Sequence, residues 1–234
     1  MSARLKTLTA AVAERELDAL LVSNIVNVRW LTGFTGSNAL AVVGRMAPRF
    51  VTDFRYLMQA ADQLDEAWER EIATELPRRA IEGLPADRPL RIGFDDAHVT
   101  VKQHAQLVER APEGVELVAA GGMLEALRAV KDAAEIEAIH AAAKLADEAL
   151  EEILAGGIVG RTERDVALDL EIAMRRRGAE GVSFAPIVAS GPHGALPHAA
   201  PRDVAIPEGT LVVVDWGAVL DGYASDCTRT FATG

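Results

Sequence analysis

Two aspartates in the last part of the sequence have the type and spacing of metal ligands. Asp215 directly follows the apolar run Leu211–Val214, and Asp226 comes eleven residues later. A buried carboxylate without a partner costs several kcal/mol, so it normally meets either a counter-charge or a metal ion. We therefore treat Asp215 and Asp226 as candidate ligands of divalent metal ions.

The turn between the two aspartates decides whether their side chains can meet. Asp221-Gly222 is typical of a two-residue β-hairpin turn. With that turn, Asp215 pairs with Thr228, and Asp226 lies two residues from this partner on the same face. Such diagonal neighbours are roughly 7 Å apart or less, which suits two metal ions about 3.5–4 Å apart. A three-residue turn would instead place the aspartates on opposite faces.

A histidine flanked by prolines is the third candidate. His198 lies between Pro197 and Pro201, which restrict the local backbone. A rigidly held imidazole can hydrogen-bond a substrate, so His198 is a candidate for catalysis and substrate binding. Two structural alternatives stay open: His198 as an exposed loop residue, and the aspartates as strand-end residues that pair with Arg229.

The net charge and the single cysteine limit the class of protein. The 234 residues carry a formal net charge of −11, which disfavours nucleic-acid binding because that requires basic patches. Cys227 is the only cysteine, so no internal disulfide is expected, and a reducing cytoplasm is the expected location. We expect Cys227 to be a small buried hydrophobe rather than a nucleophile. Neither a signal peptide nor a run of about 20 apolar residues is found, so no membrane partner is expected.

Alternating apolar and amphipathic segments predict an α/β layer structure for the first half of the chain. The region from Asn27 to Asn38 contains Gly33 and Gly36 and is interpreted as a turn. The expected elements are strands at 19–22, 39–43, 50–52, 90–94 and 115–118, and helices at 3–16, 55–64 and 101–110.

The pattern changes after Gly121-Gly122, and we place the boundary between two domains there, at 1–123 and 124–234. Residues 124 to about 154 are alanine-rich and predict either one long helix or two shorter ones. Thr162 is the expected N-cap of a helix that runs through Arg176. Prolines are frequent in the last fifty residues, where the expected elements are strands at 211–216 and 223–231.

Three stretches, in the same order along the chain, resemble the creatinase, aminopeptidase P and prolidase superfamily. The first is Asn27–Ser37 together with Val51–Tyr56, and the second is Arg128–Lys131 together with Glu135, Ile136 and Ile139. The third runs from Phe184–Gly191 through His198 and Asp215–Gly217 to Ser225–Phe231. The resemblance covers nearly the whole chain, and the ordered set is more specific than any single motif.

The resemblance implies an α/β creatinase-like N-terminal domain followed by an α+β "pita-bread" catalytic domain. It implies that Asp215 holds one metal ion through both oxygens, that Asp226 bridges two metal ions, and that His198 contacts the substrate and helps to stabilise the tetrahedral intermediate. The implied cofactors are two divalent ions, usually Mn²⁺ and sometimes Co²⁺ or Zn²⁺, with a bridging hydroxide that attacks the peptide bond.

The family completes its metal site with a second histidine and two glutamates, for which residues up to Gly234 offer no counterpart. We therefore expect the catalytic domain to be incomplete in this chain and its own activity to be low. The expected parent activity is that of an Xaa-Pro aminopeptidase, which acts on peptides with proline at the second position. A prolidase, a non-catalytic binding module and a metal-independent creatinase-like enzyme are the alternatives, and a homodimer is an expected assembly.

Overall fold

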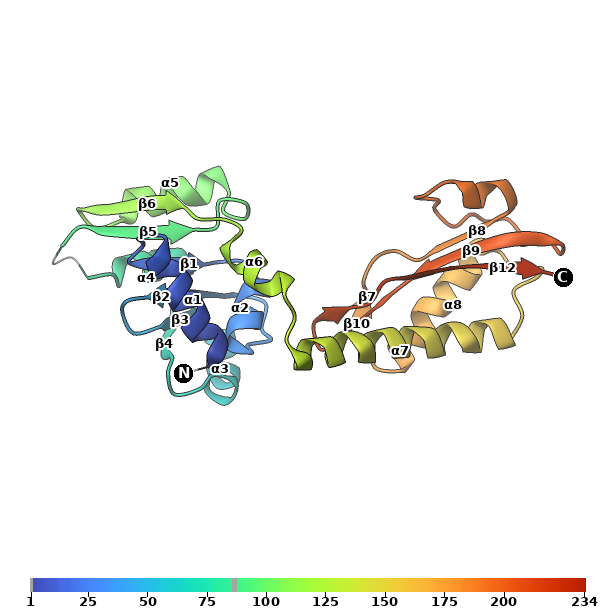
Figure 1. Cartoon of the computed structure of the whole chain (residues 1–234), viewed down its shortest axis with the longest axis horizontal. Helices are drawn as coiled ribbons and strands as arrows, with labels where there is room; N and C mark the ends of the chain where they lie inside the picture. Colours follow the sequence, from blue (N-terminus) through green and yellow to red (C-terminus); the bar gives the residue numbers. More distant parts are fainter. Residues whose placement is uncertain (1, 86–87) are drawn as a thin grey trace. The chain divides into compact units, whose positions relative to one another are not determined.

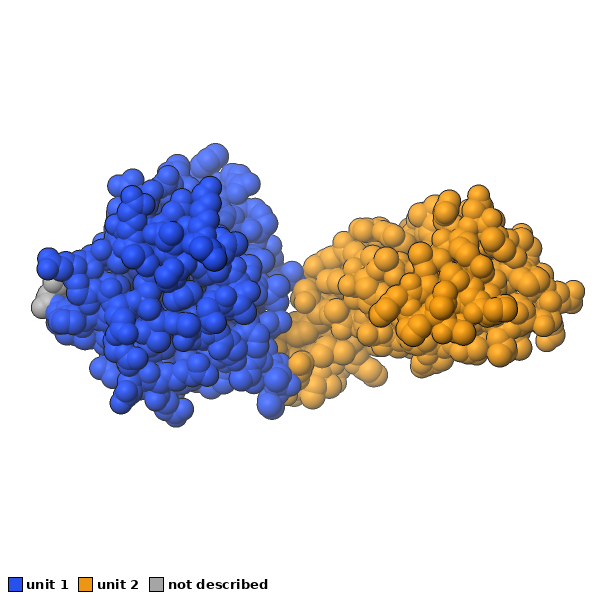
Figure 2. Space-filling model, turned by 90° about the horizontal axis from the view of Figure 1, so that it is seen from above, with its two compact units in different colours: residues 1–130 blue, residues 131–234 orange. Residues whose placement is uncertain are grey.

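The computed structural model describes residues 2–85 and 88–234, which form two compact units. Figure 1 shows the path of the chain, and Figure 2 shows the two units in different colours. Unit 1 is Met1–Val130 and unit 2 is Lys131–Gly234. Among the described residues, no helix is both long enough and apolar enough to cross a membrane.

Unit 1 is built on a six-stranded mixed sheet in the order β4-β3-β2-β1-β5-β6. The central strand β1 pairs in parallel with β5 and antiparallel with β2. The strands are β1 (Ala19–Val22), β2 (Ala39–Gly44), β3 (Arg49–Thr52), β4 (Glu69–Ile72), β5 (Leu90–Phe94) and β6 (Val115–Ala119).

Helices cover both faces of this sheet. Successive residues of a strand point to opposite faces, so Leu20 of β1 joins one core cluster and Leu21 joins the other. The first cluster contains Leu8 of α1, and the second contains Ile81 of α4. The helices are α1 (Ala3–Glu14), α2 (Ile25–Thr32), α3 (Leu57–Gln63) after the 3₁₀ turn η1 (Phe54–Tyr56), α4 (Leu76–Glu82), α5 (Val101–Arg110) and α6 (Met123–Ala129). The α/β prediction for this unit is confirmed.

The division between the units lies after Val130, not between residues 123 and 124 where we placed the boundary. Helix α6 belongs to unit 1 because Met123 and Leu124 are buried in its core. The side chain of Asn27 also holds α6: its Nδ2 donates to Glu125 at 2.7 Å, and its Oδ1 accepts from Arg128 at 2.9 Å. The predicted helical segment is thus two helices that lie in different units.

Unit 2 combines two helices with antiparallel strands, as expected for an α+β domain. Helices α7 (Ala133–Ala155) and α8 (Glu163–Arg176) pack against the sheets through a core that includes Leu150, Leu170 and Val214. One sheet has the order β8-β9-β12 and the other β11-β10-β7. The strands are β7 (Gly181–Val182), β8 (Ile187–Ser190), β9 (Thr210–Trp216), β10 (Ala218–Leu220), β11 (Tyr223–Ala224) and β12 (Cys227–Thr233).

Candidate metal centre

The hairpin that carries the two aspartates has the predicted turn and register. Asp221 and Gly222 have φ angles of 49° and 78°, the left-handed values that a type I′ turn requires at both central positions. Asp215 pairs with Thr228 across β9 and β12. Asp226 therefore lies two residues from the cross-strand partner of Asp215, as the sequence predicted.

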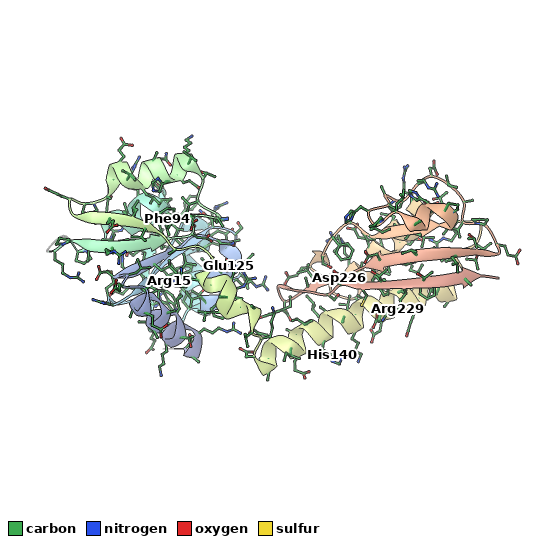
Figure 3. All side chains as sticks on the ribbon, turned by 45° about the horizontal axis from the view of Figure 1, so that its top comes forward. Arg15, Phe94, Glu125, His140, Asp226 and Arg229 are labelled. Carbon is green, nitrogen blue, oxygen red and sulfur yellow. The ribbon has the colours of Figure 1, made fainter. Side chains whose placement is uncertain are left out.

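Helix α7 anchors the residues beside the two aspartates. The residue after Asp215, Trp216, donates its Nε1–H to the carbonyl of Ala146 at 2.9 Å. The residue before Asp226, Ser225, donates its Oγ–H to the carbonyl of Ala142 at 3.2 Å. Because neighbouring residues of a strand point to opposite faces, the carboxylate of Asp215 in β9 is directed away from α7. Asp226 is exposed and lies between β11 and β12, next to the anchored Ser225. Figure 3 labels Asp226 in this part of unit 2.

A glycine allows the two strands to come close between the aspartates. A Cβ atom on Gly217 would lie 2.0 Å from the carbonyl oxygen of Ser225 and 2.2 Å from Oγ of Ser183. Ser183 uses that Oγ to donate a hydrogen bond to the same carbonyl at 2.6 Å. Any larger residue at position 217 would push Asp215 and Asp226 out of register, so the glycine is part of the scaffold of the site.

One oxygen of Asp215 has no partner in the protein. Its Oδ1 is buried and accepts no hydrogen bond. Arg229 donates its Nη1–H to the carbonyl of Thr228 at 2.8 Å, and within the described chain it forms no ion pair with either aspartate. The ion-pair alternative is therefore wrong, and a buried carboxylate oxygen remains that a divalent cation would satisfy. This orphaned oxygen is the feature that fits a metal ion.

The thiol of Cys227, next to Asp226 in the chain, is influenced by both candidate ligands. Burial raises the pKa of Cys227, and the nearby carboxylates Asp147, Asp226 and Asp215 raise it further, whereas Arg229 lowers it. Cys227 also packs against the core of unit 2. A thiol held in its protonated form is a poor nucleophile, in agreement with the expectation that Cys227 is not one, but Cys227 is half-buried rather than buried as predicted.

The structure does not bring His198 into a cluster with the aspartates. In the described part of the chain, no three His, Cys, Asp or Glu side chains are grouped so that they could hold a metal ion. His198 is exposed, in the loop between β8 and β9. This loop begins with the 3₁₀ turn η2 (Gly191–Ala195), where a Cβ on Gly194 would lie 3.1 Å from Cγ2 of Val213. Val213 is two residues from Asp215, so the loop starts over the sheet face that carries Asp215.

A buried glutamate that the sequence did not single out anchors the same loop. Glu163, the first residue of α8, has no exposed surface. Burial raises its pKa, but hydrogen bonds from Arg202 and Ser190 outweigh burial and lower the pKa to about 2. The sequence identified the preceding Thr162 as the helix cap, which the structure confirms. No local signal could reveal the role of Glu163, because Ser190 and Arg202 lie far along the chain.

Both halves of the sequence match known protein families. Residues 4–130 match the Creatinase/Prolidase N-terminal domain, and residues 137–234 match Metallopeptidase family M24. The chain belongs to the creatinase and prolidase family. The resemblance and the fold class predicted from the sequence are both confirmed.

The relatives of the chain include an uncharacterized peptidase and an Xaa-Pro dipeptidase. It is 37% identical, over 99% of its length, to the uncharacterized peptidase YqhT of Bacillus subtilis, and 28% identical, over 100% of its length, to an Xaa-Pro dipeptidase of Pyrococcus horikoshii. It covers 65% of each of these proteins, so it spans about two thirds of the length of the curated relatives it matches.

Solved structures show the same fold. The Xaa-Pro dipeptidase from Bacillus anthracis matches 99% of this chain with a TM-score of 0.90 and 32% identity, and 64% of that structure is covered. The X-Pro aminopeptidase from Thermotoga maritima matches 95% of this chain with a TM-score of 0.84 and 29% identity, and 65% of it is covered. Since both a dipeptidase and an aminopeptidase match well, the comparisons support a peptidase without separating the two types.

Proposed function

We propose that the protein to which this chain belongs is a metal-dependent Xaa-Pro peptidase of the aminopeptidase P type. The observation that carries the proposal is the buried, unpartnered Oδ1 of Asp215, whose cross-strand partner Thr228 lies two residues from Asp226. A buried carboxylate oxygen left without a partner is costly unless a cation is bound. The match to Metallopeptidase family M24 supports the same interpretation.

Asp215 and Asp226 are the residues of this chain that would hold the metal ions. Carboxylate oxygens are hard donors that suit Mn²⁺, and we propose Mn²⁺ ahead of Co²⁺ or Zn²⁺. When bound, a pair of divalent ions polarises the peptide carbonyl and lowers the pKa of water at the site.

The chain's own residues then orient the substrate. His198 is exposed on a loop that starts over the aspartate face, where its imidazole can hydrogen-bond the carbonyl of the bond to be cut. Such a donor stabilises charge that develops on that oxygen. The proposed substrate is a peptide with proline at its second position.

Calorimetric titration with Mn²⁺ tests the metal proposal. The wild-type chain should bind Mn²⁺ weakly, because the described residues supply two grouped carboxylates and no third ligand. Asp215→Asn and Asp226→Asn should each abolish the binding. The matched control is Asp221→Asn, in the exposed hairpin turn, where asparagine accepts the positive φ equally well. Equal loss in all three variants, or no loss in any, would contradict the proposal.

An Xaa-Pro dipeptidase is the second candidate, because relatives and solved structures include proteins of that name. Incubation with Mn²⁺ and either Ala-Pro or Ala-Pro-Ala separates the two types, since an aminopeptidase releases alanine from both peptides and a dipeptidase only from Ala-Pro. We expect slow turnover by the 234-residue chain, lost in Asp226→Asn. Cleavage of Ala-Ala at the same rate would refute the preference for proline, and rapid cleavage of Ala-Pro would refute the expected low activity.

A further inference from the structure

We infer that Glu163 is the positioning residue for His198, because its single buried carboxylate binds both ends of the loop that carries this imidazole. The inference rests on the proposed function, in which His198 must face a substrate beside Asp215 and Asp226. Nothing in the family comparisons assigns a role to Glu163.

One end of the loop is Ser190, the last residue of β8. Its backbone N–H and its Oγ–H both donate to Oε1 of Glu163 at 2.8 Å. Ser190 is itself buried, so water cannot replace the carboxylate as the acceptor for its two donors. The point at which the chain leaves the sheet is therefore fixed by a side chain of α8.

The other end is Arg202, which meets the same carboxylate. Its backbone N–H donates to Oε2 at 3.0 Å, its Nε–H donates to Oε2 at 2.9 Å, and its Nη2–H donates to Oε1 at 2.7 Å. A bidentate pair of arginine and carboxylate fixes orientation as well as distance. Residues 191–201, which include His198, thus lie between two residues that bind the same carboxylate.

The loop has few other bonds that could hold its shape. Inside it, Leu196 N–H donates to the carbonyl of His193, Ala199 N–H donates to the carbonyl of Leu196, and the His193 ring lies 3.1 Å from the carbonyl of Ala200. Beyond Arg202, the returning chain pairs with the start of α8, where Glu163 N–H donates to the carbonyl of Val204 at 3.1 Å. Besides the buried side chain of Ala199, the base of the loop therefore supplies the largest set of polar bonds that restrain His198.

A glutamate is the side chain that meets these demands. Five donor groups point at two oxygens, and an ionised carboxylate is an acceptor only. A glutamine would turn an NH₂ group toward either the Arg202 or the Ser190 donors, and an aspartate is one methylene too short to reach both ends. The position at the start of α8 adds the favourable field of the helix N-terminus.

The test compares Glu163→Gln with Glu171→Gln, a control on the same helix whose side chain makes an exposed i,i+4 pair with Arg175. The first measurement is hydrogen exchange of backbone amides. In Glu163→Gln, exchange across residues 190–202 should rise at least tenfold while exchange in α7 is unchanged. The control should behave like the wild type. Unchanged exchange across residues 190–202 in Glu163→Gln would overturn the inference.

The second measurement separates positioning from a structural role alone. Mn²⁺ broadens NMR signals of nearby protons, so the His198 ring signals, assigned with His198→Gln, should broaden in the wild-type chain on addition of Mn²⁺. In Glu163→Gln the broadening should be weaker, although calorimetry gives the same Mn²⁺ affinity. Equal broadening at equal affinity would overturn the positioning role even if exchange had changed.

Two further outcomes are distinguishable. If Mn²⁺ does not bind the wild-type chain, the proposed function fails and the positioning role fails with it, whereas the exchange data still show whether Glu163 holds the loop. If Glu163→Gln does not fold, Arg202→Gln replaces it, because this variant leaves the bonds from Ser190 to Glu163 intact. Arg202→Gln should then release only the returning end of the loop, and unchanged exchange there would count against the inference.

Discussion

Two aspartates, one in each unit, lie at the end of a strand and yet have opposite surroundings. In unit 1, Asp53 comes directly after β3 and is 6% exposed, and both of its oxygens are bonded. Oδ1 accepts from the backbone N–H and Nε–H of Arg55, and Oδ2 accepts from Nη2 of Arg55 and Nδ2 of Asn38. The Arg55 guanidinium holds the pKa of Asp53 well below its usual range.

Asp215 in unit 2 occurs in a similar local pattern but leaves Oδ1 buried and unpartnered. The difference lies in the next residues of each segment: Arg55 comes two residues after Asp53, whereas Trp216 and Gly217 come after Asp215. Unit 1 therefore satisfies its strand-end carboxylate with its own side chains. In the described part of unit 2, the carboxylate is left available to a cation, and this separates a structural aspartate from a candidate ligand.

The largest expected effect is at Glu163, the partnered carboxylate of unit 2. Glu163→Ala leaves the two donors of the buried Ser190 without their acceptor, at a cost of about 1–3 kcal/mol, and it removes the partner of the Arg202 guanidinium, which is 42% exposed. Hydrogen exchange at increasing denaturant, followed in α8 and β9, should show this loss in unit 2 alone. An equal loss in the β1 and β5 amides of unit 1 would show that the effect is not local.

The stability that the ionised carboxylate of Glu163 contributes should depend on pH. The pKa of Glu163 is lowered from 4.5 to about 2 in the folded chain. Its contribution, about 3 kcal/mol, is therefore fully present above pH 4.5 and is lost as the pH falls toward 2. The difference in unfolding free energy between the wild type and Glu163→Gln should shrink over this range, and a difference that stays constant down to about pH 2 would contradict the low pKa.

The comparison of Asp53 with Asp215 predicts stability changes of opposite sign in metal-free buffer. Asp53→Asn removes the charge that Arg55 binds and should lower the melting temperature of unit 1. Asp215→Asn removes the charge of a half-buried carboxylate whose Oδ1 has no partner, and it should stabilise unit 2 slightly. Hydrogen exchange in β3 and β9 reports on the two sites separately. Destabilisation by both substitutions would mean that the carboxylate of Asp215 is satisfied within the protein.

The sequence predicted those features that depend on neighbouring residues. Strands 19–22 and 90–94 and helix 101–110 have the predicted bounds, because apolar period and flanking residues are local signals. The hairpin register was predictable because Asp221-Gly222 selects one turn type. The two aspartates of the site could therefore be paired from the sequence alone.

Other features depend on distant residues, or on glycines and prolines whose role in the local structure has more than one interpretation. Helix α2 was missed because Gly33 was interpreted as part of a turn, whereas it is the left-handed C-cap of a helix that begins after Asn24. Strand β8 was missed among the prolines that precede β9. The partners of Glu163 lie 27 and 39 residues away along the chain, a separation that no local pattern reports.

The most direct test of the central claim is anomalous diffraction from crystals soaked in Mn²⁺. We predict an anomalous peak between the carboxylates of Asp215 and Asp226 and none at Asp53, whose oxygens are already bonded. A crystal that shows no peak at the two aspartates, or shows its strongest peak at Asp53, would contradict the account.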